Sequence, residues 1–233
     1  MGKLQEIKKA LKESADKNQA KILSSFFKTG PGQYGEGDIF WGIKVPQQRK
    51  IAKKYSTLSL TEITTLLSSP IHEQRLIALF ILIDQYKKAT DANKKKIFDL
   101  YLKNYRQINN WDLVDLSAPN IVGEYLTDKP RDILYRLAKS KNLWQNRIAI
   151  LATYTLIRNN DFKDALAIIE MSLKHQHDLI HKAAGWMLRE IGKRNQKLEE
   201  QFLKKHYRQM PRTMLRYAIE KFPETKRQIY LKK

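Results

Sequence analysis

The sequence predicts an all-α fold in which pairs of helices stack side by side. Apolar residues recur at helical spacing along most of the 233 residues. No segment alternates apolar and polar residues for long enough to indicate a strand. The chain also has only 9 glycines and 7 prolines, too few for a fold built from many short strands and turns.

The apolar pattern places the helices in order along the chain. Leu4, Ile7 and Leu11 share one face of a first helix whose other face carries lysines. Residues 73–88 form a longer, buried helix that ends in lysines, which suit the negative end of the helix dipole. The same pattern recurs in segments separated by short polar breaks: 94–105, 131–139, 142–158, 163–173, 178–194, 198–208 and 211–221.

The helices recur at a nearly constant spacing. The residues that head successive buried helices lie about 35 positions apart, and they are Arg75, Trp111, Arg147, Lys182 and Arg216. Such spacing is typical of helix pairs that stack into a solenoid, each pair burying its apolar face on the next. A helical bundle with fortuitous spacing is the alternative. We expect a single helical domain over residues 1–233 with a basic concave face.

The chain is strongly basic, with 44 Lys and Arg against 24 Asp and Glu and a formal net charge of +20. Such an excess attracts polyanions, nucleic acid first, although an anionic membrane or another acidic partner would also satisfy it. Cysteine is absent. Its absence excludes disulfides, thiolate nucleophiles, zinc–thiolate sites and iron–sulfur clusters, and it fits a reducing compartment.

Neither a targeting segment nor a membrane span is expected. The first residues lack the apolar core of a signal peptide. The longest apolar run, residues 76–83, is far shorter than the roughly 20 residues needed to cross a bilayer. We therefore expect a cytoplasmic protein with no membrane partner.

Motifs for metal or nucleotide binding are weak. His175, His177 and His181 are close in sequence, but no His-Glu-x-x-His pattern accompanies them, so we expect no metal and no cofactor. Residues 29–38 hold four glycines without a Gly-Lys-Ser/Thr sequence or a preceding strand. We interpret this stretch as a connector whose backbone amides are still free to touch a phosphate. No Gly-x-Ser-x-Gly nucleophile motif is present.

Residues 109–115 are more informative. Asn110 is a good N-cap, so Trp111 is expected to open a helix and Asp112 to stabilise its positive end. Trp111 and Asp115 are then neighbours on one face together with Val114. A carboxylate among an indole and apolar groups either lines a cleft or is buried with a partner, for example a lysine or arginine of the next repeat.

Two later segments have the same character. Arg147 follows Trp144 and stands at the repeat position equivalent to Trp111. Lys182, Trp186 and Arg189 are related by steps of three or four residues and are expected on one side of a helix, with Glu190 beside them. A solenoid brings equivalent repeat positions to one concave face, so these side chains are candidates for a common site.

Four motifs in register resemble the AlkD-type DNA alkylation repair family. They are Trp-Asp-x-Val-Asp at residues 111–115, Trp-x-x-Arg at 144–147, Lys-Ala-x-Gly-Trp-x-Leu-Arg-Glu at 182–190, and Gly-Ile-x-x-Pro-x-x-Arg at 42–49. Together they extend over most of the chain in the order and spacing of the family. Each motif is weak alone, but the four in register are specific.

The resemblance implies a right-handed solenoid of HEAT-like repeats that grips duplex DNA and hydrolyses the N-glycosidic bond of purines alkylated at N3 or N7. By the family pattern, Asp115 matches the catalytic carboxylate, Trp111 and Trp186 the aromatic residues around the damaged nucleotide, and Arg147 an arginine that contacts phosphate. Lys182 and Arg189 are further candidates for DNA binding. Phe26 stands where many members carry a tyrosine.

The resemblance also bears on partners and activity. It implies double-stranded DNA containing alkylated purines as the partner, a protein that acts as a monomer, and association with the nucleoid when bound to DNA. The family includes relatives thought to bind branched DNA without glycosylase activity. A non-catalytic helical-repeat protein that binds damaged or branched DNA is therefore the alternative.

Overall fold

The computed structural model describes residues 2–232, and within them the chain is all-α, as the sequence predicts. The only β-type pairing in that range is an isolated bridge between Ile39 and Ile71. The chain divides into two compact units, Met1–Ser117 and Ala118–Lys233. Each unit is described by itself, and the single domain expected over residues 1–233 stays a prediction.

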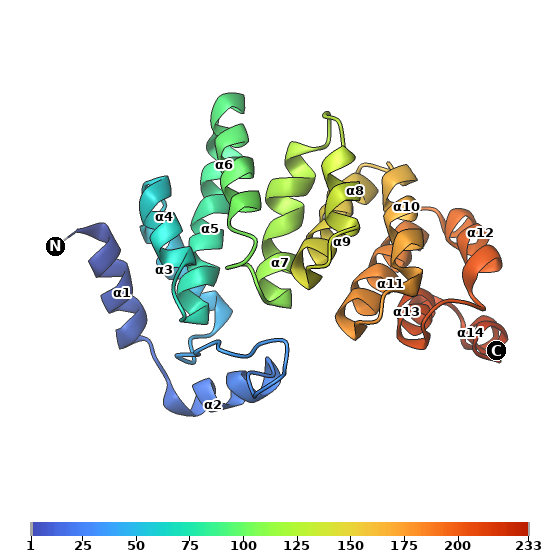
Figure 1. The fold of residues 1–233 in the computed structure, drawn as a ribbon, viewed down its shortest axis with the longest axis horizontal. Coiled ribbons are helices and arrows are strands. Elements are labelled where there is room, and N and C mark those ends of the chain that lie inside the picture. The colour runs from blue at the N-terminus through green and yellow to red at the C-terminus, as the bar shows by residue number, and fades with distance from the viewer. Residues whose placement is uncertain (1, 233) are drawn as a thin grey trace. The chain divides into compact units, whose positions relative to one another are not determined.

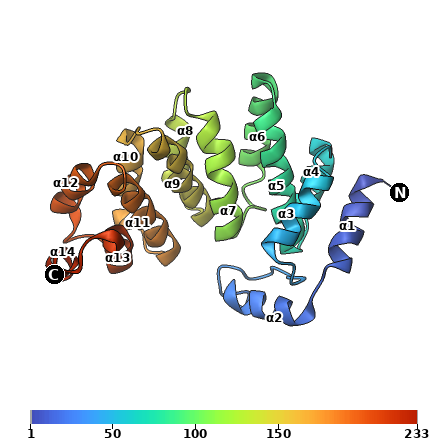
Figure 2. The same ribbon diagram turned by 180° about the vertical axis from the view of Figure 1, so that it is seen from behind.

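The first unit contains six complete helices and nearly all of a seventh. They are α1 (Lys3–Glu13), α2 (Lys17–Phe26), α3 (Val45–Lys54), α4 (Leu60–Leu67), α5 (His72–Lys88), α6 (Asp91–Lys103) and α7 (Trp111–Ala118). Helices α3 and α4 both pack on α5, and α1 packs on α3 and α5. Figure 1 shows α3 to α6 side by side, and Figure 2 shows the same helices from behind.

Helix α5 forms the core of the first unit. Every residue of the run Leu76–Ile83 is buried, so this helix is apolar on nearly all sides, as the sequence predicts. Ile63, Leu66 and Leu67 of α4 are fully buried against it. A capping box between Ser59 and Glu62 starts α4.

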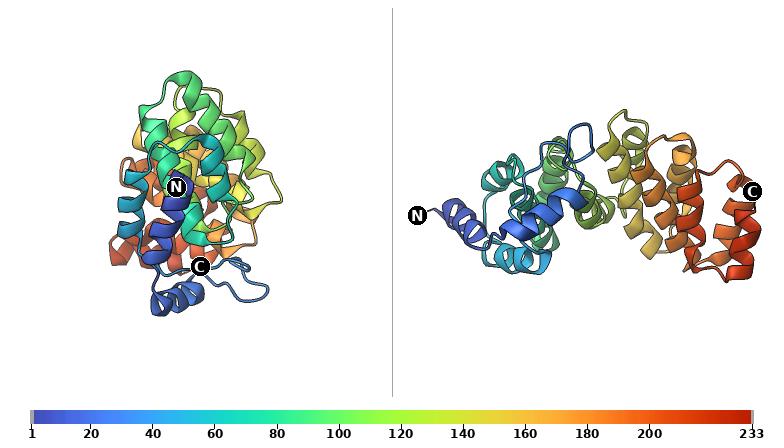
Figure 3. Two further views of the ribbon diagram at one scale, coloured as in Figure 1. Left: turned by 90° about the vertical axis from the view of Figure 1, so that its left-hand side faces the viewer. Right: turned by 90° about the horizontal axis from the view of Figure 1, so that it is seen from below.

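Helix α2 differs from its neighbours because none of its residues is buried. Asp16 caps it, accepting hydrogen bonds from the backbone N–H groups of Asn18 and Gln19 at 2.8 and 3.0 Å. The helix lies across the ends of the other helices of its unit, as the right panel of Figure 3 shows from below. Its last residue, Phe26, brings an aromatic ring to the start of α7.

The second unit is an array of helix pairs. Its helices are α8 (Asp132–Ala138), α9 (Leu143–Arg158), α10 (Lys163–Met171), α11 (Asp178–Gly192), α12 (Gln196–His206), α13 (Arg212–Ala218) and α14 (Glu224–Leu231), with short π or 3-10 segments η1 (Pro119–Gly123), η2 (Ser172–Lys174) and η3 (Ile219–Lys221). Helices α9, α11 and α13 pack in one row, and α8, α10 and α12 each pack on a member of that row.

The predicted repeat is visible in the register of the second helices. Arg147, Lys182 and Arg216 are each the fifth residue of their helices α9, α11 and α13. Arg75 is the fourth residue of α5, whereas Trp111 is the first residue of α7. A regular all-α repeat is therefore confirmed, and the chain departs from it most at α7. No helix within residues 2–232 has the length and apolar character of a membrane span.

Candidate functional site

The start of α7 carries the tryptophan and the carboxylate that the sequence singled out. The helix begins at Trp111, as predicted. The Oδ1 atom of Asn110 accepts the backbone N–H of Trp111 at 2.8 Å, and Asp112 adds a negative charge at the positive end of the helix. Val114 is buried. Trp111 and Asp115 lie one turn apart and both are half-buried.

Two aromatic rings at the end of α2 contact Trp111. Phe27 stacks on its indole with ring centroids 5.1 Å apart and an interplanar angle of 21°. Phe26 approaches the same indole edge-on at 5.9 Å, and its side chain is 61% exposed. Phe27 also stacks on Phe40 at 5.0 Å. Offset stacking and edge-on contacts are the favoured arrangements of aromatic pairs. These contacts therefore hold the indole of Trp111 in a fixed orientation.

A buried network of charged side chains lies beneath these rings. The His72 ring places Nδ1 3.1 Å from Oδ2 of Asp38 and Nε2 2.8 Å from Oδ2 of Asp112. Arg75 donates to Oδ1 of Asp38 at 2.5 Å, and the amide of Asn110 donates to Oδ2 of the same carboxylate at 3.1 Å. All five side chains are buried. We call Asp38, His72, Arg75, Asn110 and Asp112 the His72 network.

Electrostatics favour the charged forms in this network. Burial alone lowers the pKa of His72, but the charge of Asp112 and the hydrogen bonds to Asp112 and Asp38 outweigh it and raise the pKa to about 9. Burial acts to raise the pKa of Asp38, yet its bond to His72 and the nearby Arg75 hold that pKa below its usual value. His72 is therefore an imidazolium, with a hydrogen on both ring nitrogens, at neutral pH.

The segment that follows Asp38 is held by a second buried carboxylate. Glu73 is fully buried and accepts hydrogen bonds from the backbone N–H groups of Trp41, Gly42 and Ile43 at 3.0, 2.8 and 3.2 Å. Gly42 has a φ of 83°, and a Cβ there would collide with the carbonyl oxygen of Asp16. The glycine of the 42–49 motif is thus required by the backbone, and the motif has a structural role.

Asp115 lies close to a buried hydroxyl pair. The hydroxyl groups of Tyr101 and Ser117 are 2.8 Å apart. Burial raises the pKa of Tyr101; its bond to Ser117 acts in the opposite direction, and the negative charge of Asp115 adds to the rise. The carboxylate of Asp115 is therefore close enough to Tyr101 to act on it electrostatically. The buried hydroxyl pair is thus part of the surroundings of Asp115.

In the second unit, Arg147 is buried, with only 4% of its surface exposed. Its guanidinium donates a hydrogen bond to the carbonyl oxygen of Leu179. Arg75 of the first unit does the same toward the carbonyl oxygen of Ser69 at 2.9 Å. Arg147 and Arg75 thus each bind a backbone carbonyl within their own unit. The contact of Arg147 with a DNA phosphate stays a prediction.

Helix α11 carries a second half-buried tryptophan. The indole N–H of Trp186 donates to Oε1 of Glu190 at 3.2 Å, and Tyr154 of α9 lies beside the ring at 6.0 Å. Glu190 is buried and also pairs with Lys193 at 2.6 Å. Trp186 and Glu190 therefore share a side of α11, as their spacing predicts.

The other two candidates on α11 pair with carboxylates. Lys182 forms an ion pair with Asp178 at 2.8 Å, one turn earlier in the helix. Arg189 pairs with Glu220. Their predicted contacts with DNA remain predictions.

The three clustered histidines form hydrogen bonds around the start of α11. Nδ1 of His177 accepts the N–H of Leu179 at 3.1 Å and so caps the helix. The rings of His175 and His181 bond to Asn146 and to the backbone of His175, respectively. Within residues 2–232, no three His, Cys, Asp or Glu side chains are grouped to hold a metal ion.

Comparison with protein families identifies the family to which the chain belongs. The family model described as DNA alkylation repair enzyme matches residues 7–222. The chain belongs to the DNA alkylation repair enzyme family. This confirms the family predicted from the four motifs, and it gives the protein a role in the repair of alkylated DNA, with DNA as its partner.

A solved structure supports the fold of this family member. The chain is similar to the structure named predicted DNA alkylation repair enzyme from Enterococcus faecalis, with a TM-score of 0.72 and 16% sequence identity. The match covers 91% of this chain and 98% of that one. At this identity the likeness shows the fold alone. A comparison with curated proteins gave no match.

The glycine-rich stretch of this alkylation repair protein is ordered by its own side chains. The N–H of Gly30 binds Oε1 of Gln33 at 3.0 Å, and that of Gly32 binds Oε2 of Glu36 at 2.9 Å. Gly32 has a positive φ of 73°. These amides have internal acceptors, so the contact with a phosphate suggested by the sequence has no support here.

Sequence reasoning missed the His72 network of this family member. His72 and Asp38 are 34 residues apart, and His72 and Asp112 are 40 residues apart. A signal was present in the polar run His-Glu-Gln-Arg at residues 72–75, where an otherwise apolar helix begins. A buried helix that starts with four polar residues needs partners for all of them.

Proposed function

We propose that this protein is a DNA glycosylase that hydrolyses the N-glycosidic bond of purines alkylated at N3 or N7 in duplex DNA. Family membership supports a role in alkylation repair. The observation that carries the glycosylase proposal is the pair Trp111 and Asp115, one turn apart on α7 and both half-buried, with the exposed Phe26 ring beside the indole.

The chemistry suits a fixed carboxylate. Alkylation at N3 or N7 gives the purine a positive charge, so the base departs as a neutral molecule when the bond between C1′ and the purine nitrogen breaks and takes the bonding electron pair. Positive charge then develops on the deoxyribose. The oxygen of a water molecule adds to C1′, and its proton passes to the carboxylate or to solvent.

Asp115 is the side chain that we assign to this role. A preorganised negative group beside C1′ stabilises the developing cation in a site partly cleared of water. The same carboxylate is able to orient or deprotonate the attacking water. Its position on the first turns of α7, a rigid element, supports the precision that such a role needs.

The aromatic residues favour cationic lesions. The face of an indole such as that of Trp111 attracts a nearby cation by roughly 0.5–2 kcal/mol, and Trp186 of the second unit has the same property. Phe26 adds an exposed ring edge next to Trp111. Recognition of this kind selects for the positive charge of an alkylated purine without hydrogen bonds to the edge of the base.

In this proposal lysine and arginine side chains bind the phosphates of the DNA backbone. The net charge of +20 favours binding to phosphates. Within this proposal Lys182 and Arg189 contribute from the second unit, whereas a phosphate contact by Arg147 requires its buried guanidinium to leave the carbonyl oxygen of Leu179. Lys182 is half-buried and pairs with Asp178 on its own helix, and exchanging that partner for a phosphate costs little because exposed ion pairs are weak.

The proposal is tested by Asp115→Asn. We expect base release from DNA containing 7-methylguanine to fall by about 10²–10³, the usual effect of removing one preorganised electrostatic group. DNA affinity stays within about twofold, because the amide has the size of the carboxylate and most of the affinity comes from phosphate contacts. Released base is measured by chromatography under single-turnover conditions, and affinity by fluorescence anisotropy.

Asp99→Asn is the matched control. Asp99 is an exposed carboxylate on α6 that pairs with Lys95 at 2.6 Å, so this variant removes the same charge away from α7 and leaves base release unchanged. Excision by Asp115→Asn within about threefold of wild type contradicts the assignment. A wild-type protein that binds DNA and releases no base supports the alternative, a non-catalytic protein that binds damaged or branched DNA.

A further inference from the structure

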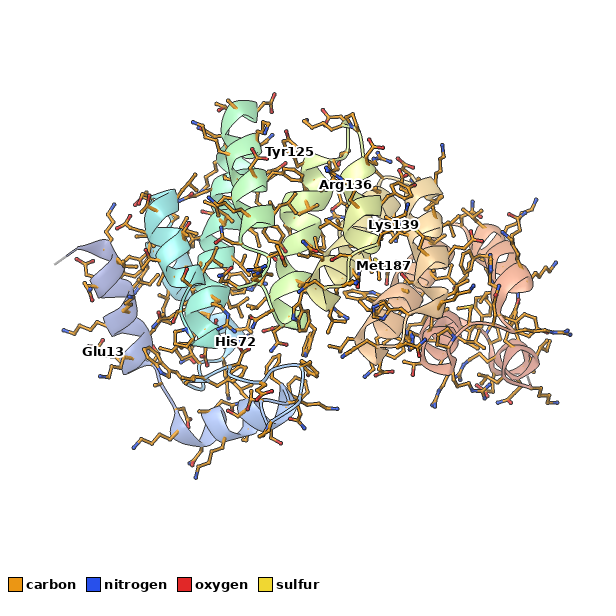
Figure 4. The ribbon with its side chains drawn as sticks, viewed as in Figure 1. Glu13, His72, Tyr125, Arg136, Lys139 and Met187 are labelled. Carbon is orange, nitrogen blue, oxygen red and sulfur yellow. The ribbon has the colours of Figure 1, made fainter. Side chains whose placement is uncertain are left out.

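A buried histidine joins three segments of the first unit. Asp38 ends the glycine-rich stretch, His72 opens α5 and Asp112 lies in the first turn of α7. Figure 4 shows His72 at the start of its helix, next to the turns between α2 and α3. Ionised carboxylates only accept hydrogen bonds. Both ring nitrogens must therefore carry a hydrogen for both bonds to form, and such a ring is an imidazolium.

The charges that face this ring balance one another. Asp38 faces it from the glycine-rich stretch and Asp112 from α7, and Arg75 of α5 lies 3.5 Å from Nδ1. The other groups against the ring are the aromatic side chains of Phe40 and Phe27, at 4.4 and 5.2 Å between centroids. A neutral His72 leaves two buried carboxylates with one guanidinium, an arrangement that carries a large desolvation cost.

The network reaches the proposed site by two routes. Through the side-chain amide of Asn110, Nδ2 donates to Asp38 and Oδ1 accepts the backbone N–H of Trp111. Across the ring faces, His72 packs against Phe27, which in turn stacks on Trp111. Both routes end at the first turn of α7, and Asp115 lies one turn further along the same helix.

We propose that His72 is a positioning residue: as an imidazolium between Asp38 and Asp112, it fixes the start of α7 and so the orientation of Trp111 and Asp115. This inference rests on the proposed glycosylase function. The ring is 1% exposed, so it acts through other side chains and touches neither DNA nor water at the reaction centre. Loss of its charge therefore lowers the rate of base release and leaves DNA affinity in place.

The first test compares His72→Gln with Asp164→Asn. Asp164 is the matched control because it accepts hydrogen bonds from Arg131 and Tyr135 in the second unit, so the variant weakens a comparable network elsewhere. At saturating protein we expect His72→Gln to release base at least about tenfold more slowly, with its Kd for DNA within about twofold of wild type. Asp164→Asn keeps the wild-type rate. A folded His72→Gln variant with the wild-type rate overturns the proposal.

The second test is a pH profile, which a purely structural role does not produce. The rate of base release is measured at each pH for the wild type, for Asp164→Asn, which retains His72 and should follow the wild type, and for His72→Gln. In the wild type the rate falls as the pH rises through about 9, the pKa of His72. In His72→Gln that fall is absent. Identical profiles for the two proteins overturn the proposal.

The third test needs neither a variant nor enzymatic activity. Ring resonances of the five histidines and the indole N–H resonance of Trp111 are followed by NMR as the pH rises. We expect His72 to stay charged up to about pH 9 and the Trp111 signal to shift with the same midpoint. A His72 that titrates near 6.5, or a Trp111 signal that does not follow it, overturns the proposal.

The tests separate the two proposals. A wild-type protein that releases no base refutes the glycosylase function alone, because the NMR titration still decides whether His72 controls Trp111. If His72→Gln does not fold, the same titration on the wild-type protein decides the question.

Discussion

Phe26 is an exposed aromatic residue of the proposed site, so its substitution tests the contribution of that site to DNA binding directly. Its ring is 61% exposed and meets Trp111 edge-on. Stacking between an aromatic side chain and a base contributes about 1–3 kcal/mol, and an edge contact gives the low end of that range. We expect Phe26→Ala to weaken binding to lesion-containing DNA by about fivefold, which corresponds to about 1 kcal/mol. Fluorescence anisotropy measures this affinity.

Ile22→Ala is the control for that prediction. Ile22 lies one turn earlier on α2, is also 61% exposed, and forms no part of the proposed site. It should leave affinity unchanged, while Phe26→Tyr keeps the ring and the wild-type affinity. Equal losses in Phe26→Ala and Ile22→Ala would show that α2 contributes only general apolar surface.

The sequence identified residues best where their neighbours are local. Trp111 and Asp115 are four positions apart, and the helical period alone placed them on one side of α7. The same reasoning placed Trp186 beside Glu190. It did not identify His72 or Asp38 because their partners come from segments 34 to 40 residues away. Burial of Arg147 was not predicted either, since the carbonyl of Leu179 that it binds belongs to another helix.

Among the helices, the long apolar ones were predicted with the best boundaries. The predicted segment 142–158 became α9, and 178–194 became α11 with its end two residues earlier. Segments 163–173 and 211–221 each end in a short 3-10 turn. Helix α3 was not assigned from the pattern because only a few of its residues are apolar, and its packing on α5 decides its conformation.

Helix α12 carries a buried carboxyl group with a testable effect on stability. Burial raises the pKa of Glu199, the charge of Glu200 adds to the rise, and the value reaches about 8. Its Oε1 atom has no hydrogen-bond partner. A carboxyl group whose pKa is raised on folding stabilises the protein fully below its unfolded pKa of 4.5. That contribution is lost as the pH rises toward 8.

Glu199→Gln removes this titration. We expect its free energy of unfolding to exceed that of the wild type at pH 8 by about 4 kcal/mol, because the pKa of Glu199 rises from 4.5 to about 8 and each pKa unit corresponds to about 1.4 kcal/mol. The two proteins converge near pH 4. Guanidinium unfolding curves at several pH values measure the difference, and Glu124→Gln, at an exposed position of the same unit, provides the control. A constant difference across this pH range would contradict the assignment.

At the scale of the whole molecule, charge is the property that bears on DNA binding. The net charge of the chain is +20, so its affinity for DNA is expected to depend on salt concentration. If about six phosphates are neutralised, the logarithm of affinity falls against the logarithm of salt concentration with a slope near −5. We expect a slope at least as steep as about −3 in titrations at several salt concentrations. A nearly flat response contradicts an electrostatic grip on DNA.

The sequence by itself determined the all-α repeat, the family, and the pair Trp111 and Asp115. These depend on composition, on the helical period and on motifs that are continuous along the chain. Only the tertiary structure decided that Glu73 holds the 41–43 backbone and that the His72 network lies beneath Trp111. The physical reason is that buried charges need partners, and these partners come from distant segments that become neighbours only when the helices pack.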